Sequence, residues 1–422
     1  MKSQGPVVVV GGGIVGVSAS LALARSGHPV VVIERESEVG LGSTAQSTAI
    51  IRQFYATVPG VQLAREGLHV WQDWSGFLGL AEGEGSDLAR FYDSGVLVFA
   101  PASDPVTERT IAVMRECGVA LEVIPGPEIA KRFEHLDLGD REENVVGIYE
   151  SESGFVHGPD QATRNLRSAA EEAGVEFRLG EIVASIESVY DSKRRRRQVT
   201  GVRTSRDFLK TSLVLNAGGP HSGQINRMAR TPLPVTTAPL RQHVVDLDFP
   251  RVSGDVPVLA DLSGELYVRS RPGSIRLGSL AHADETAFIE DPDQAVNPPA
   301  EIASEYERRW KSLRRGERSP EGWSVSAGVY DVCVLDWYPI VDRTETDGYF
   351  VAIGTSGAWF KGAPVIGELV AELIDVWVRE GRDTDCNPLV TTLPRSGVTF
   401  EMAQLSRHRR PLLPPGEAST IG

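Results

Sequence analysis

Three glycines near the N-terminus, Gly11, Gly13 and Gly16, have the spacing G-x-G-x-x-G. The first glycine of such a turn permits a sharp bend, the second lets backbone approach a pyrophosphate, and the third lets a helix pack closely on a strand. Glu34 ends the next apolar run, about 20 residues later, where a carboxylate can accept hydrogen bonds from ribose hydroxyls. The alternative is a glycine-rich turn without a ligand, but the combination favours a dinucleotide site.

A lone arginine, Arg52, lies in the segment STAQSTAIIRQFY at 43–55. The segment begins with hydroxyl residues, and Ser43 and Thr44 could reach the same pyrophosphate. It ends with apolar and aromatic residues, so Arg52 stands at the edge of what is expected to be a packed segment. The local sequence leaves open whether this cation serves the cofactor, a helix end or a substrate.

The glycine motif, Glu34 and Arg52 must be positioned by strands and helices, and the sequence predicts several of these. The β-branched run at 6–10 suits a buried parallel strand, and the Ala- and Leu-rich run after Gly16 suits a helix whose free N–H groups would face phosphates. Further strand-like runs of the same unit return at 174–189, 212–222 and 348–377. We therefore expect an α/β fold in which the chain leaves the cofactor-binding unit and re-enters it.

Composition narrows the class of protein. The chain has 422 residues, 41% of them hydrophobic, and a formal net charge of −14, which argues against nucleic acid or an anionic membrane as a partner. The basic run at 192–198 lies between two strand-like runs, so we expect a solvated hairpin tip rather than a docking patch. Three scattered cysteines suggest a reducing compartment and provide neither a disulfide framework nor a metal cluster.

The N-terminal stretch also has an early lysine, an apolar middle and the small residues ALA, as a secretory signal does. Its glycine spacing fits nucleotide binding better. No run approaches the roughly 20 apolar residues that a membrane span needs. We expect a cytoplasmic protein without a membrane or nucleic-acid partner.

The chain resembles the FAD-dependent D-amino-acid oxidase (DAO) superfamily, in particular its sarcosine oxidase and dimethylglycine dehydrogenase-like branch. The resemblance is carried, in the order found in that family, by GGGIVG, VVVIER, GSTAQSTAIIRQFY, ESGFVHGPDQ, LVLNAGG, AGVYDV and GTSGAWFKGAP. It implies a Rossmann-like FAD-binding domain interleaved with a substrate domain on a mostly antiparallel sheet, so that the fold is α/β locally and α+β overall.

On that resemblance the chain divides into three parts. The FAD-binding domain takes 1–78, 156–223 and 326–384, and the substrate-binding domain takes 79–155 and 224–325. Residues 385–422, with three prolines in RRPLLPP and no clear apolar period, are expected to form a loosely held tail.

The resemblance also assigns roles to particular side chains. Arg52 and Lys361 match an arginine and a lysine that clamp the substrate carboxylate, an anion that a guanidinium fork binds well. Tyr330 matches an active-site tyrosine, Tyr267 is a looser candidate for the pocket wall, and Arg276 is the approximate match of an oxygen-activating lysine. The start of a helix near Pro364 would stabilise negative charge on the reduced flavin.

The residues expected to contact FAD come from the glycine motif, the hydroxyl-rich loop, the returning strands and the C-terminal glycine loop. They are Gly11, Gly13, Ile14, Val15, Gly16, Glu34, Arg35, Gly42, Ser43, Thr44, Thr48, Val183, Ala217, Gly218, Gly357, Ala358, Trp359, Phe360 and Lys361. No metal ligand set is expected.

Three departures from the sarcosine oxidase pattern bear on function. Gly328 stands where monomeric sarcosine oxidases attach their flavin through cysteine, and STAQSTA lacks a histidine, so we expect non-covalent FAD. Arg276 replaces a lysine and cannot readily exchange a proton, which leaves O₂ or another electron acceptor open. Ala49 stands where a second arginine is found, so the charge of the pocket must differ.

Two functions of different class follow. The first is an FAD-dependent oxidoreductase that oxidises the C–N bond of a carboxylate-bearing amine, whether a secondary or N-methyl, a cyclic or a D-amino acid, to an imine. The second is the flavin subunit of a hetero-oligomeric dehydrogenase that passes electrons to a partner. A 2-hydroxy-acid dehydrogenase of the same superfamily also stays open, and the protein could act as a homo- or hetero-oligomer.

Overall fold

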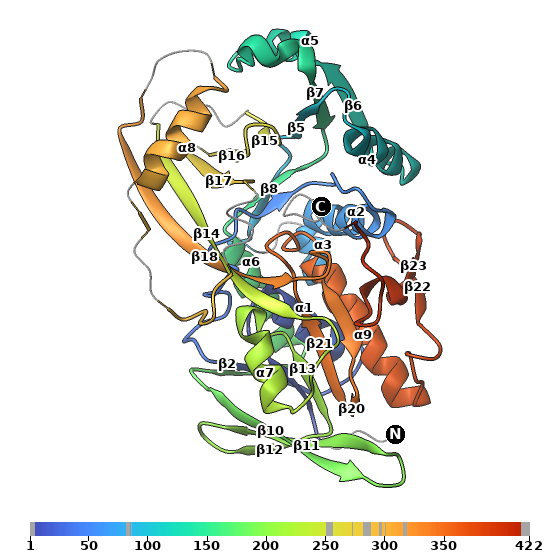
Figure 1. The fold of residues 1–422 in the computed structure, drawn as a ribbon. Coiled ribbons are helices and arrows are strands. Elements are labelled where there is room, and N and C mark those ends of the chain that lie inside the picture. The colour runs from blue at the N-terminus through green and yellow to red at the C-terminus, as the bar shows by residue number, and fades with distance from the viewer. Residues whose placement is uncertain are drawn as a thin grey trace.

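A six-stranded sheet forms the centre of one half of the molecule (Figure 1). The computed structural model describes residues 5–81, 85, 87–249, 256–271, 273–281, 288–294, 298–299, 301–314 and 319–414. The sheet runs β19 (Ile340–Arg343), β21 (Tyr349–Ile353), β13 (Leu213–Asn216), β1 (Val7–Val10), β2 (Val30–Glu34) and β9 (Glu176–Leu179). All neighbours pair in parallel except β19 and β21. Each returning segment adds a strand to this sheet, as the sequence predicts, although the second strand of 174–189 belongs to a different sheet.

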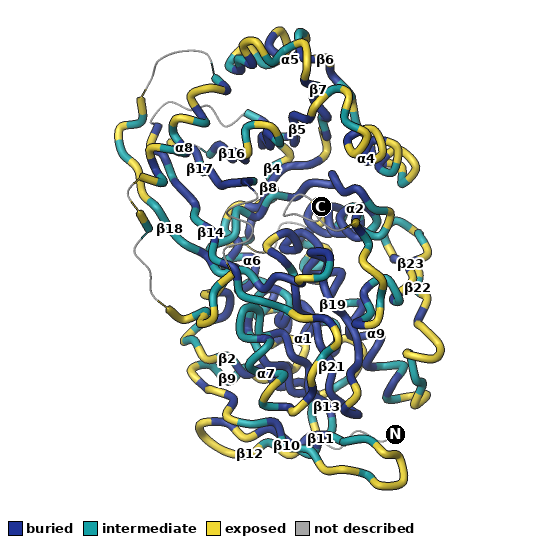
Figure 2. Tube along the Cα trace, in the orientation of Figure 1, coloured by how far each residue is buried: buried dark blue, intermediate teal, exposed yellow. Residues whose placement is uncertain are grey.

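Helices cover this sheet. They are α1 (Ile14–Arg25), α6 (Pro159–Glu172) and α9 (Ala363–Glu380). Helices α1 and α9 approach so closely that a Cβ on Gly367 would lie 2.6 Å from the carbonyl carbon of Ser18. Much of the deepest burial surrounds these helices and strands (Figure 2). The fold thus packs a helix from the N-terminal part of the chain against one from the C-terminal part.

A second, smaller sheet lies at one end of this half. It contains the hairpin of β10 (Val183–Asp191) and β11 (Arg196–Thr204), with β12 (Phe208–Lys210) and β20 (Thr346–Asp347). The basic run is therefore at a hairpin tip, as predicted, and the tip is largely exposed (Figure 2).

The other half is built on an eight-stranded sheet. Its order is β18 (Gly322–Cys333), β14 (Thr237–Asp248), β17 (Ser274–Ser279), β16 (Leu266–Arg271), β15 (Val258–Asp261), β5 (Val96–Pro101), β7 (Val145–Glu150) and β6 (Leu121–Pro125). All pairs are antiparallel except β5 with β15. Around it lie α4 (Pro105–Glu116), α5 (Gly126–Arg132), the 3₁₀ helix η1 (Gly139–Asn144) and α8 (Glu301–Lys311). A separate hydrophobic core fills this half.

Short elements connect the halves. The sheet of β3 (Ile50–Ile51), β8 (Gly154–His157) and β4 (Arg90–Tyr92) lies between them, with α2 (Val58–Gln72), α3 (Trp74–Leu78), η2 (Gly219–His221) and α7 (Ser222–Met228) nearby. The interleaved α/β architecture is as predicted, although the boundary placed after 325 falls inside β18. Within the described residues, none of the helices is long and apolar enough to cross a membrane.

The C-terminal segment is packed, so the prediction of a loosely held tail is wrong for the part that the structure describes. It forms β22 (Val390–Thr392), β23 (Thr399–Glu401) and η4 (Met402–Leu405). Its apolar side chains join the main core although their spacing is irregular: Leu389, Leu393, Phe400, Met402, Leu405 and Leu413. Residues 415–422 lie outside the described part of the chain.

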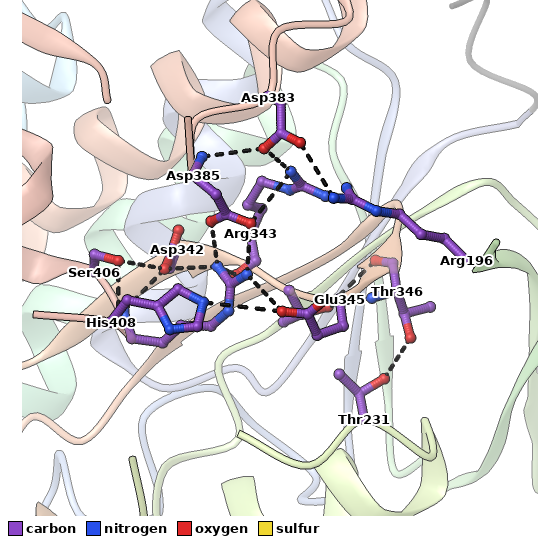
Figure 3. A network of polar contacts seen from close by, with 12 residues as sticks. Arg196, Thr231, Asp342, Arg343, Glu345, Thr346, Asp383, Asp385, Ser406 and His408 are labelled. Atoms are coloured by element: carbon purple, nitrogen blue, oxygen red, sulfur yellow. Dashed lines mark hydrogen bonds and ion pairs between the residues drawn. The ribbon is translucent and has the colours of Figure 1, made fainter. Parts of the chain in front are cut away.

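Ion pairs of two buried arginines hold this segment against β19 (Figure 3). The guanidinium of Arg407, fully buried, donates to Asp342 at 2.9 Å and to Asp385 at 2.9 and 2.8 Å. Arg343 pairs with Asp383, which also accepts from Arg196 at 3.2 Å. A sequence pattern cannot reveal such an anchor, because its partners come from distant parts of the chain.

Candidate active site

A cavity of about 440 Å³ opens where β1 and β2 of the six-stranded sheet end. Its wall includes the glycine turn, the hydroxyl-rich loop after β2, the end of β18 and the loop after β21. In a parallel sheet the ligand site is expected at the carboxyl ends of the strands. The cavity lies at that place.

The glycine turn is shaped for a ligand. Neither Gly11 nor Gly16 can be replaced by a residue that has a Cβ atom. A Cβ on Gly11 would overlap the carbonyl of Ala217, and a Cβ on Gly16 would overlap the carbonyl of Gly11. A Cβ on Gly13 would meet only Thr44 Oγ1, at 3.5 Å, and otherwise enter the cavity. Helix α1 begins at the next residue, Ile14, whose N–H donates to Thr44 Oγ1 at 3.2 Å, and the N-terminal end of the helix faces the same space. This cradle fits the pyrophosphate of a dinucleotide.

Glu34 is held in place by backbone. Its Oε2 accepts from Gly12 N at 2.6 Å and its Oε1 from Glu36 N at 2.9 Å, and the residue lines the cavity. Carboxylate oxygens retain further lone pairs and can accept from ribose hydroxyls. The predicted ribose end of the site is therefore preorganised.

Arg35, the next residue, closes one side of this end. It donates to both oxygens of Asp293, at 2.9 and 2.7 Å. The ring nitrogen Nε2 of His221 lies 3.0 Å from Asp293 Oδ1 and 3.0 Å from Arg35 Nη1. All three residues line the cavity. Sequence reasoning missed Asp293 and His221, since they come from the link after β17 and from η2.

We predict that Asp293→Asn loosens FAD. The variant removes the charge that joins the link after β17 to Arg35, a half-exposed pair worth at most about 1 kcal/mol. The dissociation rate of FAD should rise up to about five-fold, and less in high salt. It can be followed by flavin fluorescence after dilution, with Glu290→Gln as the control. An unchanged rate at low salt would show that the contact does not retain FAD.

The hydroxyl-rich loop contacts the end of β18. Ser43 Oγ donates to the carbonyl of Val329 at 2.5 Å, and a Cβ on Gly328 would lie 2.9 Å from Gln46 Cβ. These residues line the cavity together with Tyr330. None of the lining residues in the described part of the chain is a cysteine. Gln46 was not predicted, although it belongs to the loop that was.

Asp331, which the sequence did not single out, is a buried carboxyl in the cavity wall. It accepts from Gly354 N at 2.7 Å and from Ser222 Oγ at 3.0 Å. Burial raises the pKa of Asp331 to about 7 despite these bonds. The folded protein therefore retains this proton well above the pH at which an unfolded chain loses it.

A pH dependence of stability follows. Between about pH 4 and 7 the unfolded chain releases the proton of Asp331 while the folded protein keeps it, so the contribution of Asp331 to stability falls as pH rises through this window. Asp331→Asn cannot ionise and should gain up to about 4 kcal/mol relative to wild type between pH 4 and 8. Urea unfolding of both proteins across this range measures it. A constant difference would mean that folded Asp331 is already ionised at pH 4.

The two predicted clamp residues are buried side by side with Tyr55. Arg52 donates to the carbonyl of Phe54, and its guanidinium carbon lies 4.4 Å from the centre of the Tyr55 ring. Lys361 Nζ donates to Tyr55 OH at 3.1 Å and to the carbonyl of Ala358. Arg52 and Lys361 are 7% and 3% exposed, so the fold does bring these distant cations together.

The clamp adjoins the cavity through aromatic residues. Trp359 and Phe360 line the cavity, and Lys361 follows them directly. The ring of Tyr55 stacks on Trp359 with centres 4.9 Å apart. Burial, and then the charge of Arg52, lower the pKa of Lys361 well below its usual range. An anion bound here would raise the pKa of Lys361 and favour its protonated form.

Glu150 is the counter-charge that sequence reasoning missed. This fully buried carboxyl accepts from Gln53 N at 2.7 Å and from Ser153 Oγ at 2.5 Å. Burial raises its pKa, while Arg52 and Lys361 act in the opposite direction. When Arg52 and Lys361 are both protonated, two cations face this one carboxylate, an arrangement that suits an anionic ligand.

Ala49, the position at which the resemblance implies a second arginine, is buried with φ of +49°. Its carbonyl accepts from Val156 N at 2.9 Å, which ties the chain to β8 just before Arg52. Because alanine has no charge, this position adds no third cation to Arg52 and Lys361.

The remaining predicted site residues form a second cluster on the eight-stranded sheet. Tyr267 hydrogen bonds with both Tyr330 and Thr48. Arg276 already has a partner, because Asp246 accepts from its guanidinium at 2.9 and 2.8 Å. Of the five predicted catalytic residues, Tyr330 alone lines the cavity in the described part of the chain.

Most of the predicted cofactor residues do line it. Gly16, Thr48, Ala358 and Lys361 lie behind the wall, and the others form it: Gly11, Gly13, Ile14, Val15, Glu34, Arg35, Gly42, Ser43, Thr44, Val183, Ala217, Gly218, Gly357, Trp359 and Phe360.

The parallel sheet, the glycine cradle and the preorganised carboxylate together define a dinucleotide-dependent enzyme with a separate substrate sheet. The model of the FAD dependent oxidoreductase (DAO) family matches residues 6–373, so the chain belongs to that family and depends on FAD. This confirms the resemblance, the fold class and the cofactor inferred from the motifs.

Individual relatives agree with this assignment. The chain is 26% identical over 406 residues to FAD-dependent oxidoreductase domain-containing protein 1 of Bos taurus, covering 87% of this chain and 80% of that protein. It is 26% identical over 385 residues to sarcosine oxidase subunit beta of Rhizobium meliloti, covering 88% and 85%. The structure of L-proline dehydrogenase from P. horikoshii superposes with a TM-score of 0.76 at 24% identity, covering 97% and 98%, which shows the shared fold.

Proposed function

We propose that the protein oxidises the C–N bond of a carboxylate-bearing amine to an imine. The observation that carries the proposal is the buried pair of basic side chains, Arg52 and Lys361, which faces the single carboxyl of Glu150 and adjoins the cavity wall at Trp359. Two cations in a buried position bind a carboxylate strongly, because little water competes. The relative named sarcosine oxidase subunit beta supports an amino-acid substrate.

The chain's residues divide the work between cofactor and substrate. Gly11, Gly13 and the start of α1 would hold the phosphates of FAD, and Glu34 would hold the ribose. FAD supplies the capacity to accept a hydride. Arg52 and Lys361 would fix the substrate carboxylate and thereby set the position of the carbon that bears nitrogen.

The proposal is tested by anaerobic bleaching of the bound flavin. The panel contains N-methyl, cyclic, D- and L-amino acids and 2-hydroxy acids, each with a matched decarboxylated amine or alcohol. We expect a carboxylate-bearing amine to bleach the flavin and its decarboxylated counterpart to fail. If only the hydroxy acids bleach the flavin, the proposal is wrong and the protein is a 2-hydroxy-acid dehydrogenase.

A second candidate is a flavin subunit that passes electrons to a partner. The name of the Rhizobium meliloti relative, a subunit beta, is the observation that favours it. Peroxide release in air, measured with the size of the purified yellow protein, separates the two. A monomer that releases one peroxide per turnover supports an oxidase, and reduced flavin that persists in air supports a partner.

A further inference from the structure

Arg269 is a buried cation that the carboxylate clamp does not explain. It lies on β16 and is 2% exposed. Its Nη1 donates to the carbonyl of Thr48 at 2.6 Å, and its guanidinium carbon lies 5.0 Å from the centre of the Phe155 ring. Its Nε is buried without a hydrogen-bond partner.

The carboxylate that acts on Arg269 from its own sheet, Asp246, is shared with other arginines. Arg276 stands directly opposite on β17, and two like charges in such a pair repel. Asp246, the carboxylate in this row, is bound by the fork of Arg276, and Arg271 approaches it at 3.6 Å. Within the described residues no carboxylate forms an ion pair with Arg269. A buried cation without a counter-charge is costly, so the site favours an anion.

Arg269 points to the side of the sheet that meets the cavity. It is two residues from Tyr267, and side chains at this spacing share a face of a strand. Tyr267 in turn hydrogen bonds with Tyr330, which lines the cavity. Burial, and then Arg276, lower the pKa of Arg269 to about 9, in keeping with an unmet need for negative charge.

The site therefore has two separate positive centres. One is Arg52 with Lys361, which reach Tyr55, and the other is Arg269, which reaches Thr48. The segment from Thr48 to Arg52 runs between them. If each centre binds an anionic group through its own contacts, one small carboxylate cannot bind to both centres at once.

We propose that Arg269 binds a second acidic group of the substrate, so that the substrate is an amine with two anionic groups. This rests on the proposed function, in which Arg52 and Lys361 bind the first carboxylate. Arg269 then acts as a specificity-determining residue: it selects among carboxylate-bearing amines and takes no part in the chemistry.

The test uses carboxylates that FAD cannot oxidise. Acetate, propionate, succinate and glutarate are titrated into the yellow holoenzyme, and binding is read from the flavin absorbance spectrum. We expect the better dicarboxylate to bind wild type at least ten-fold more tightly than propionate. Arg269→Gln should abolish this preference while changing the dissociation constant of propionate less than about two-fold, and Arg269→Lys should keep part of it.

Arg271→Gln is the matched control, since Arg271 lies two residues further on the same face and is more exposed. It should keep the preference. FAD content and thermal unfolding with excess FAD report whether each variant folds. If Arg269→Gln does not fold, Arg269→Lys, which keeps the charge, is used for the comparison instead.

The outcomes separate this inference from the proposed function. If propionate binds through Arg52 and a second acid adds nothing, the inference is overturned and the proposed function stands. If Arg269→Gln weakens propionate and dicarboxylates equally, Arg269 binds the only carboxylate and the second acidic group is refuted. If no carboxylate binds and no amine bleaches the flavin, the proposed function fails first.

Discussion

Arg52→Ala is expected to weaken the binding of a carboxylate ligand about 100-fold and to leave FAD bound. Truncating one partner of a buried charge pair costs 2–5 kcal/mol or more, and about 2.7 kcal/mol corresponds to that factor. Arg52 lies behind Trp359 and does not line the cavity, so FAD loses no contact with it. Acetate titration of the holoenzyme measures the dissociation constant, and FAD content is read from the same spectra.

Arg25→Ala is a matched control for this variant. Arg25 also donates to backbone carbonyls, at 2.8 and 3.0 Å, and lies over an aromatic ring, Phe77, but it is remote from the clamp on the far end of α1. It should leave acetate binding unchanged. Loss of FAD in Arg52→Ala, with unchanged acetate affinity in the remaining holoenzyme, would contradict the clamp.

Lys361 adds a signature in pH to the same experiment. Because the pKa of Lys361 is lowered in the free protein, a bound anion must favour its protonated form. Acetate affinity should therefore fall as pH rises through the pKa of Lys361, and Lys361→Met should remove that slope. Acetate has no amine, so its own ionisation does not obscure the effect between pH 6 and 10.

The sequence predicted the parts of this site that depend on local geometry. Gly11, Gly13 and Glu34 can be recognised because a tight turn, a helix start and a strand end each need a particular residue type at a fixed spacing. Family motifs added Arg52 and Lys361, whose meeting depends on the fold.

Residues whose role depends on distant partners were missed. Glu150 is one of two acids in ESESG, with no local feature that marks it, and only the fold brings it to the two cations. Arg269 did carry a signal, because in GELYVRS it alternates with Tyr267 and must share its face. Nothing in the strand, however, shows that Asp246 on another strand is already bound by Arg276.

Gly13→Ala is expected to weaken FAD binding at least 100-fold while the apoprotein stays folded. The backbone of Gly13, with φ of −73° and ψ of 174°, suits alanine, and the new Cβ would meet only Thr44 Oγ1 at 3.5 Å. Away from this contact, the methyl group of the alanine would project into the cavity at the start of α1, where the phosphates are proposed to lie. FAD titration by fluorescence quenching gives the affinity, and circular dichroism with urea unfolding gives the stability of the apoprotein.

Gly16→Ala separates a cofactor effect from a structural one. A Cβ on Gly16 would overlap the carbonyl of Gly11, so α1 would have to move away from β1 and the apoprotein itself should lose several kcal/mol. Gly223→Ala, whose Cβ would lie 3.8 Å from Arg227 Nη1 outside the cavity wall, should change neither property. If Gly13→Ala destabilised the apoprotein as much as Gly16→Ala, the turn would serve packing alone. If Gly13→Ala bound FAD as wild type does, the phosphates would have to lie elsewhere in the cavity.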